Sequence, residues 1–249
     1  AFTRANENPL ANSTWAGPTI VGWDQLKLVS NVVKASTNDL DAVSYWSVGT
    51  FAADQEAYIT LAAISAGVVS GVEICLRLAN PNSSGATDGY MVGLFNSSNT
   101  AQVYRIDNDA FTQLGANIAV TAPVAGDKLG ATIIGTTITP YHFKSAAWNA
   151  LATRTDATYN AAGYIAGGIF EQTSVGTVSG DDFGGGAVTA AGSSSVSPSA
   201  SRSLSPSASV SHSVSPSVSP SVSSSVSRSV SPSVSPSASV SPSASPSVS

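Results

Sequence analysis

Residues that could act as general bases or nucleophiles are few in this chain of 249 residues. His142 lies in TPYHFKS, which has the composition of a half-buried strand, and His212 lies in a serine repeat. The single cysteine, Cys75, lies in GVEICLRLA, where we interpret it as a small buried hydrophobe. No Gly-x-Ser-x-Gly element favours a serine nucleophile. We therefore predict that the protein is not an enzyme.

Aromatic side chains offer a different chemistry, because their rings can stack on the apolar faces of sugars. The chain contains four Trp and seven Tyr residues. Trp148, in KSAAWNALA, lies near the tip of an expected hairpin and is our candidate ligand residue. Trp15, Trp23 and Trp46 lie in expected strands, and we predict that they belong to the core.

The elements that must position these residues are strands. Between about Trp15 and Phe183, short β-branched or alternating stretches are separated every ten or so residues by Gly, Asn, Asp and Pro. This spacing predicts an all-β antiparallel sandwich. Turn residues dominate 80–89, 96–100 and 122–127. The expected strands are 55–63, 71–79, 88–95, 101–108, 127–143 and 163–170.

The segment 71–79 alternates with a period of two, as a strand with one face toward a core does. One predicted face carries Val72, Ile74, Leu76 and Leu78, and the other carries Glu73, Cys75 and Arg77. Residues 24–35 could follow a helical period, but their β-branched pairs favour a strand.

The order of these pieces resembles a known superfamily. The segments that carry the resemblance are AFTRANENPLANSTWAG, SYWSVGTFAADQEAYITLA, GVEICLRLA, DGYMVGLF, GDKLGATIIGTTITPY, TRTDATYNAAGYIAGGIF and DDFGGG. Together they look like the concanavalin A-like lectin and glucanase superfamily, in particular its laminin G-like jelly rolls. The resemblance implies a jelly-roll β-sandwich over residues 1–190. It also implies that the first and last strands lie side by side, with Phe2 near Phe183.

The resemblance also implies which sites to look for. Lectin and laminin G-like relatives often bind calcium at the rim of the sandwich, and here it points to Asp156, Asp181 and Asp182, whose alternative role is to cap turns. Glucanases of the superfamily carry a Glu-x-Asp-x-x-Glu run, which provides the two neighbouring carboxylates of retaining hydrolysis. This sequence has no such run, and its glutamates are scattered. Calcium is therefore the one cofactor that the resemblance suggests.

Charge and hydropathy exclude two classes of partner. The formal net charge is −5, and no cluster of cations is present that could bind a nucleic-acid backbone. The sequence contains no run of about 18 apolar residues, so it predicts no membrane span. Three Asn-x-Ser/Thr triplets, at Asn12, Asn82 and Asn96, are candidate glycosylation sites.

Residues 191–249 have a composition of their own, because serine occupies every odd position from Ser193 to Ser249. Recurrent proline disfavours a central sheet strand, so we expect a non-globular, extended tail with a reach of about 180 Å at about 3.1 Å per residue. Dense Ser with Pro is typical of O-glycosylated stalks. The alternative is that the tails of neighbouring chains pair into a fibre. Candidate O-glycosylation sites are Ser197, Ser205, Ser215, Ser219, Ser231 and Ser235.

The leading hypothesis is a lectin-like module on a glycosylated stalk, located outside the cell, on the cell surface or on a virion. Its partners would be glycans or copies of itself, and its role adhesion or surface structure. One alternative is a self-assembling filament or virus-fibre subunit, a homo-oligomer through the tail. A glycan-degrading enzyme is the third.

Overall fold

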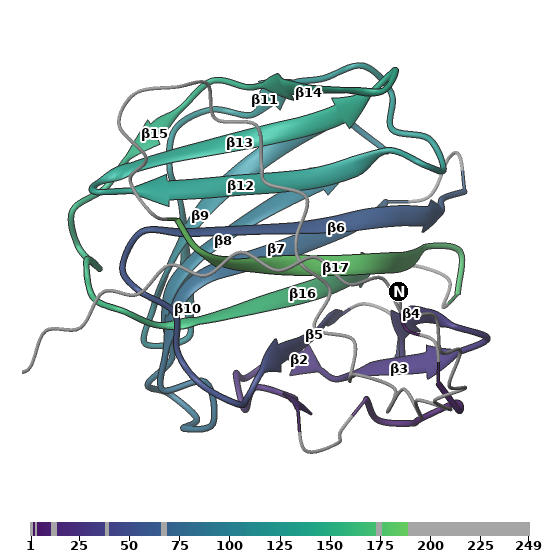
Figure 1. Cartoon of the computed structure of the whole chain (residues 1–249), viewed down its shortest axis with the longest axis horizontal. Coiled ribbons are helices and arrows are strands. Elements are labelled where there is room, and N and C mark those ends of the chain that lie inside the picture. The colour runs from purple at the N-terminus through teal and green to yellow at the C-terminus, as the bar shows by residue number, and fades with distance from the viewer. Residues whose placement is uncertain are drawn as a thin grey trace, which may run out of the picture. The chain divides into compact units, whose positions relative to one another are not determined.

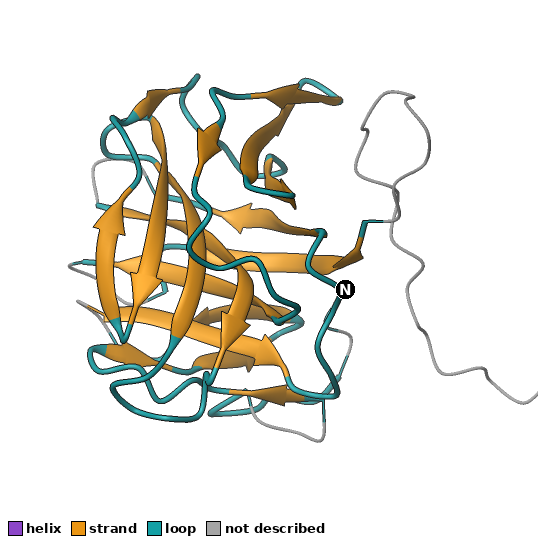
Figure 2. Ribbon diagram, turned by 90° about the vertical axis from the view of Figure 1, so that its left-hand side faces the viewer, coloured by secondary structure: helices purple, strands orange, loops and turns teal. Residues whose placement is uncertain are grey.

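The computed structural model describes residues 2, 4–10, 14–37, 40–65, 69–172 and 176–188. The expected stalk of residues 191–249 lies outside this set. Every regular element within the set is a strand (Figure 2). The described residues form no helix that is long and apolar enough to cross a membrane.

The strands form two sheets, which we call sheet I and sheet II (Figure 1). Sheet I has nine strands in the described residues, in the order β1-β5-β16-β7-β8-β9-β10, with β2 beside β5 and β11 beside β9. All its pairs are antiparallel except β2 with β5. Its strands are β1 (Trp15–Ala16), β2 (Trp23–Asp24), β5 (Leu40–Trp46), β7 (Ser70–Ala79), β8 (Asp88–Phe95), β9 (Thr100–Asp107), β10 (Ala110–Gln113), β11 (Ile118–Ala119) and β16 (Tyr164–Glu171).

Sheet II has eight strands in the described residues, in the order β14-β13-β12-β6-β17-β4-β3, with β15 beside β13. Neighbours far apart in sequence, such as β6 and β17, give the connections of a jelly roll. The strands are β3 (Leu26–Val29), β4 (Val32–Ala35), β6 (Gln55–Ala63), β12 (Lys128–Ile134), β13 (Thr137–Lys144), β14 (Ala147–Ala150), β15 (Arg154–Thr155) and β17 (Ser179–Ala187).

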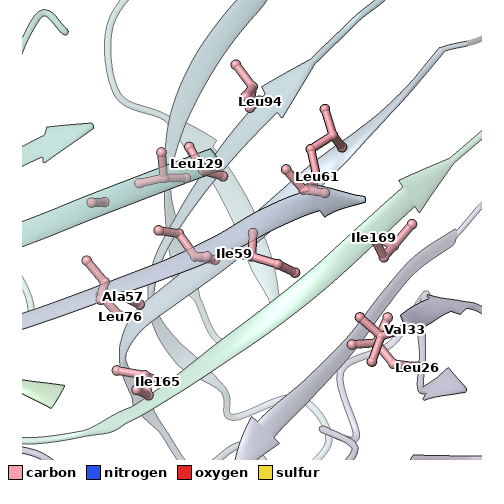
Figure 3. Close-up of a cluster of buried hydrophobic side chains, with 14 of the residues drawn as sticks. Leu26, Val33, Ala57, Ile59, Leu61, Leu76, Leu94, Leu129, Ile165 and Ile169 are labelled. Carbon is pink, nitrogen blue, oxygen red and sulfur yellow. The ribbon is translucent and has the colours of Figure 1, made fainter. Parts of the chain in front are cut away.

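The core lies between the inner faces of the two sheets (Figure 3). Ile59 and Leu61 of β6 and Leu129 of β12 meet Leu76 of β7 and Leu94 of β8, and all five side chains are fully buried. Each such burial contributes about 1.5–3 kcal/mol. The predicted all-β sandwich is therefore confirmed.

Most expected strands match the structure to within a residue, as at 55–63. Residues 24–35 hold the end of β2 and the antiparallel strands β3 and β4, and no helix. The single strand expected at 127–143 is wrong, because it is a hairpin of β12 and β13 in which Ile134 pairs with Thr137. Gly135, with φ 57°, takes the left-handed conformation that the turn requires.

The predicted alternation of β7 is correct as far as Leu76 and wrong beyond it. Arg77 has φ 51°, and the pairing with β8 shifts between Leu76 and Ala79. This bulge turns the Arg77 side chain toward sheet II, where Nη2 donates to Gly135 O at 2.8 Å, and it places Leu78 in the same outer cluster as Cys75. Cys75 itself is buried, as predicted.

The expected proximity of Phe2 and Phe183 is confirmed, because both rings pack against Trp15, with centroids 5.7 and 5.3 Å away. The backbone N–H of Phe2 also donates to Asp181 Oδ1 at 3.4 Å. Phe2 itself lies outside any strand, and the described part of the leading segment pairs with β3 through a bridge between Glu7 and Leu28.

Candidate functional site

The outer face of sheet I, which points away from the core, is built from rows of paired residues. One row runs from Val43 through Gly168, Glu73 and Gly93 to Gln102. Glu73 therefore lies between two glycines on the neighbouring strands. Because a glycine has no side chain, the sheet face forms a depression around the Glu73 carboxyl.

The next row places aromatic rings beside this depression. It runs from Asp41 through Phe170 and Gly71 to Phe95. The rings of Phe170 and Phe95 meet edge to face across Gly71, with centroids 6.0 Å apart. A Cβ added to Gly71 would come within 2.9 Å of Phe95 Cδ1, so the glycine is needed for this contact.

A second aromatic group lies on the same face. Phe111 of β10 contacts Trp23 of β2 at 5.6 Å and Tyr104 of β9 at 6.3 Å between ring centroids. Phe111 is 38% exposed, whereas Met91 beneath this group is 4% exposed. This aromatic group thus exposes the Phe111 ring to solvent and covers the buried side chain of Met91.

These rows enclose a hollow of about 340 Å³, which we call the outer pocket. Aromatic and apolar side chains dominate its wall, and two carboxyl groups lie in it. Its lining residues are Asp41, Val69, Glu73, Met91, Phe95, Ser97, Ser98, Gln102, Tyr104, Phe111 and Phe170.

The two carboxyl groups of the outer pocket are poorly solvated. Burial raises the pKa of Asp41 to about 6. Burial and then the charge of Asp41 raise the pKa of Glu73 well above its usual value. A hydrogen bond between the two carboxyls lowers the pKa of Asp41 and raises that of Glu73, so Glu73 holds the proton. Glu73 is 1% exposed, and its Oε2 is buried without a hydrogen-bond partner.

A second hollow, of about 460 Å³, lies beside His142 and Lys144 on β13. His142 Nε2 and Lys144 Nζ each lie 2.9 Å from Asp127 Oδ2. Although burial raises the pKa of Asp127, hydrogen bonds from Lys144, the Val124 N–H and His142 outweigh it and lower that pKa. The polar groups here satisfy one another, and His142 is a buried strand residue.

The residues expected to bind calcium do not form one site. Asp156 Oδ1 accepts hydrogen bonds from Tyr90 Oη at 2.9 Å and Thr158 N at 2.8 Å, and its Oδ2 lies 3.1 Å from Arg105 Nη1. Asp181 and Asp182 lie on β17, where Asp181 Oδ1 accepts from the Asp182 N–H at 2.7 Å. No group of three or more His, Cys, Asp or Glu that could hold a metal ion is found among the described residues. Asp156, Asp181 and Asp182 are therefore not gathered into one group in the described residues, and calcium binding at any of them stays a prediction.

Trp148, the expected ligand residue, lies on the outer face of sheet II and is half-buried. Its ring centroid lies 5.2 Å from that of Phe143 and 6.3 Å from that of Tyr58. It covers Gly130, where an added Cβ would meet Trp148 Cζ3 at 2.7 Å. Of the other tryptophans, Trp15 and Trp46 pack on the core as predicted, whereas Trp23 belongs to the outer face of sheet I.

The candidate glycosylation sites differ in their surroundings. Asn82 is exposed in a turn. The Asn96 Nδ2, which would carry a glycan, donates to Ser65 O at 2.5 Å. Asn12 and the six tail serines lie outside the described residues.

Sequence reasoning assigned Glu73 to the face opposite the core and missed Asp41 altogether. An acid between apolar residues, as in GVEICL, was the available signal. The ring contact of Phe95 with Phe170 had no such signal, because β8 and β16 are far apart in the chain.

The sequence matches no protein-family model and no curated protein. Solved structures share the fold. The carbohydrate-binding module CBM66 from Bacillus subtilis is 11% identical, with 72% of this chain and 100% of that chain covered and a TM-score of 0.53. A Bacillus subtilis protein of unknown function with a galectin-like fold is 10% identical, covering 73% of this chain and 94% of that one, with a TM-score of 0.51.

The exoplasmic/lumenal domain of VIP36 in its Ca2+/Man2-bound form is 12% identical, covering 74% of this chain and 82% of that chain, with a TM-score of 0.51. At such identities the likeness is one of fold. The described part of the chain thus folds as a galectin-like jelly-roll sandwich, which is consistent with the concanavalin A-like resemblance of its sequence.

Proposed function

We propose that the sandwich is a glycan-binding module without catalytic activity and that the outer pocket is its ligand site. The observation that carries this proposal is the convergence of aromatic rings and carboxyl oxygens in one open hollow. The fold is shared with a carbohydrate-binding module and with a lumenal domain whose described form contains Man2.

The chemistry of the outer pocket suits a sugar. Phe111 and Tyr104 offer ring faces or edges to the apolar side of a pyranose. Asp41, Gln102 and the rim serines Ser97 and Ser98 offer acceptors and donors to hydroxyl groups. Concave, mostly apolar sites with a few polar groups are the common form of small-ligand sites.

A glycan array followed by calorimetry on the full chain tests this proposal. We expect at least one glycan class to bind and Phe111→Ala to weaken its binding about tenfold, as loss of a stacked ring does. Trp148→Ala is the matched control, because it removes an aromatic side chain from the outer face of the other sheet. If Trp148→Ala abolishes binding and Phe111→Ala does not, the site lies on sheet II.

We propose in addition that the module is displayed outside the cell or on a virion, with residues 191–249 as an O-glycosylated stalk that serves adhesion or surface structure. The Ser-x composition supports this proposal. Mass spectrometry of the native protein should find sugar on tail serines such as Ser215 and Ser219. An unmodified tail together with concentration-dependent filaments would favour the self-assembling subunit instead.

A further inference from the structure

Among the described residues that line it, the outer pocket has two acids, Asp41 and Glu73, and no lysine, arginine or histidine. Asp41 of β5 and Glu73 of β7 lie on either side of β16 in neighbouring rows, and Gly168, which is opposite Glu73, has no side chain to fill the space beside the Glu73 carboxyl. In the part of the chain that the structure describes, neither acid forms an ion pair with a lysine, arginine or histidine. The ion pairs between described residues use other carboxylates: Glu7, Asp54, Asp107, Asp127 and Asp156.

The other titratable groups that face this pair do not supply a positive charge either. Cys75 on β7 and Tyr104 on β9 both have a pKa raised by burial and then by the charges of Glu73 and Asp41. Asp24 of β2 is engaged elsewhere, with Ser36 and Thr37. Tyr45 and Tyr164, on β5 and β16, pair their rings with each other at 5.2 Å.

Glu73 shows most directly that a donor is missing. Its side chain is 1% exposed, it lines the outer pocket, and its Oε2 has no hydrogen-bond partner. A buried carboxyl oxygen without a donor is costly, since it has lost water and gained nothing in return. A ligand with a positively charged N–H donor would supply the hydrogen bond that Glu73 Oε2 lacks and the positive charge that the two acids lack.

The wall of the pocket suits a cation as well. The rings of Tyr104, Phe111, Phe95 and Phe170 surround the acids. An ammonium group within about 6 Å of a ring centre is attracted to the ring face. A neutral hydroxyl gains no such attraction, so the wall and the acids favour the same ligand charge.

We propose that the outer pocket binds a glycan unit carrying a protonated amino group, with the ammonium seated between Asp41 and Glu73. The inference rests on the proposed function and names its ligand class. On binding, the proton that Glu73 shares with Asp41 leaves to solvent, and the ammonium replaces it as the positive partner of two carboxylates. The amine keeps its own proton, so each binding event releases at least one proton.

The test compares three oligosaccharides of equal length by calorimetry with the full chain at pH 5.5: a β-1,4-glucosamine oligomer, its N-acetylated counterpart and a β-1,4-glucose oligomer. We expect the glucosamine oligomer to bind at least about tenfold more tightly than the other two, the scale of a charge-assisted hydrogen bond. Titration in two buffers of different ionisation enthalpy should show net proton release with the glucosamine oligomer alone.

Two variants locate the effect. Glu73→Gln and Asp41→Asn keep the size of each side chain, and we expect each to remove the preference for the amine and reduce proton release. Glu56→Gln is the matched control, because Glu56 is a half-buried carboxyl on sheet II, outside the outer pocket.

The outcomes separate the two proposals. Equal binding of all three oligomers, unchanged in Glu73→Gln, would leave the glycan-binding function standing and overturn the amine preference. Tighter binding of a neutral oligomer would do the same. If none of the three oligomers binds and the glycan array is also empty, both proposals fail.

Discussion

The two faces of sheet I are built differently. The inner face carries aliphatic side chains such as Ile74, Leu76 and Leu94, packed against sheet II. The outer face carries glycines, aromatic rings and the acids Asp41 and Glu73 around a hollow. Stability is concentrated on the inner face, whereas the outer face holds unsatisfied groups that a stable core would avoid. Such a compromise is typical of a binding site.

The largest expected effect comes from the inner face. Leu76→Ala should lower the free energy of unfolding by about 2–5 kcal/mol, because it leaves a cavity between the sheets. Denaturant unfolding measures this, and the glycan affinity of the folded protein should not change. A cost under about 1 kcal/mol would show that the core tolerates voids and would break the contrast between the faces.

The next effect is the pH dependence of stability caused by the two acids. Folding raises the pKa of Asp41 from 3.8 to about 6, so the folded state binds the proton more tightly. The stabilising contribution is therefore present below pH 4 and is lost as the pH rises through 6, by about 2 kcal/mol.

Unfolding of wild type and of Asp41→Asn/Glu73→Gln between pH 4 and pH 7 measures this contribution. The double variant should lose less stability over that range and should be the more stable protein at pH 7. Parallel pH profiles would mean that folding does not raise the pKa values of the pair.

A smaller effect is expected at the glycines of β16. A Cβ at Gly168 would lie 2.9 Å from Val43 Cγ2 and 3.3 Å from Glu73 Cβ. Gly168→Ala should cost about 1–2 kcal/mol and weaken glycan binding, because it crowds the carboxyl pair. Gly167→Ala is the control, since its Cβ would meet Phe183 on the inner face at 2.8 Å. It should cost stability and leave binding intact. Weaker binding in both variants would mean that strand distortion is responsible.

The smallest effect is expected at Cys75, in the buried cluster beside the outer pocket. Cys75 packs with Val43, Met91 and Ile106 but does not line the pocket. Cys75→Ala should therefore cost about 1 kcal/mol and leave the affinity unchanged. Chemical denaturation and calorimetry check the two values. A loss of affinity would extend the site into this cluster.

The sequence predicted the inner face better than the outer one. Alternation in 55–63 and in 71–76 reflects a local period, so strands and inward-facing residues could be inferred from it. The bulge at Arg77 could not, because it depends on backbone conformation and on pairing with β8. The pairing of Asp41 with Glu73 also escaped, because the strand between them comes from residues 164–171.

The position of β16 between β5 and β7 has a consequence for how the protein is made. During synthesis, the strands that carry the two acids emerge long before the one that joins them. Until residues 164–171 arrive, β5 and β7 have open edges toward each other, and closing that gap requires contacts of high sequence separation, which form slowly. The binding surface is thus completed late. A nascent chain that stops before residue 164 would carry both acids but would lack the strand that joins β5 to β7.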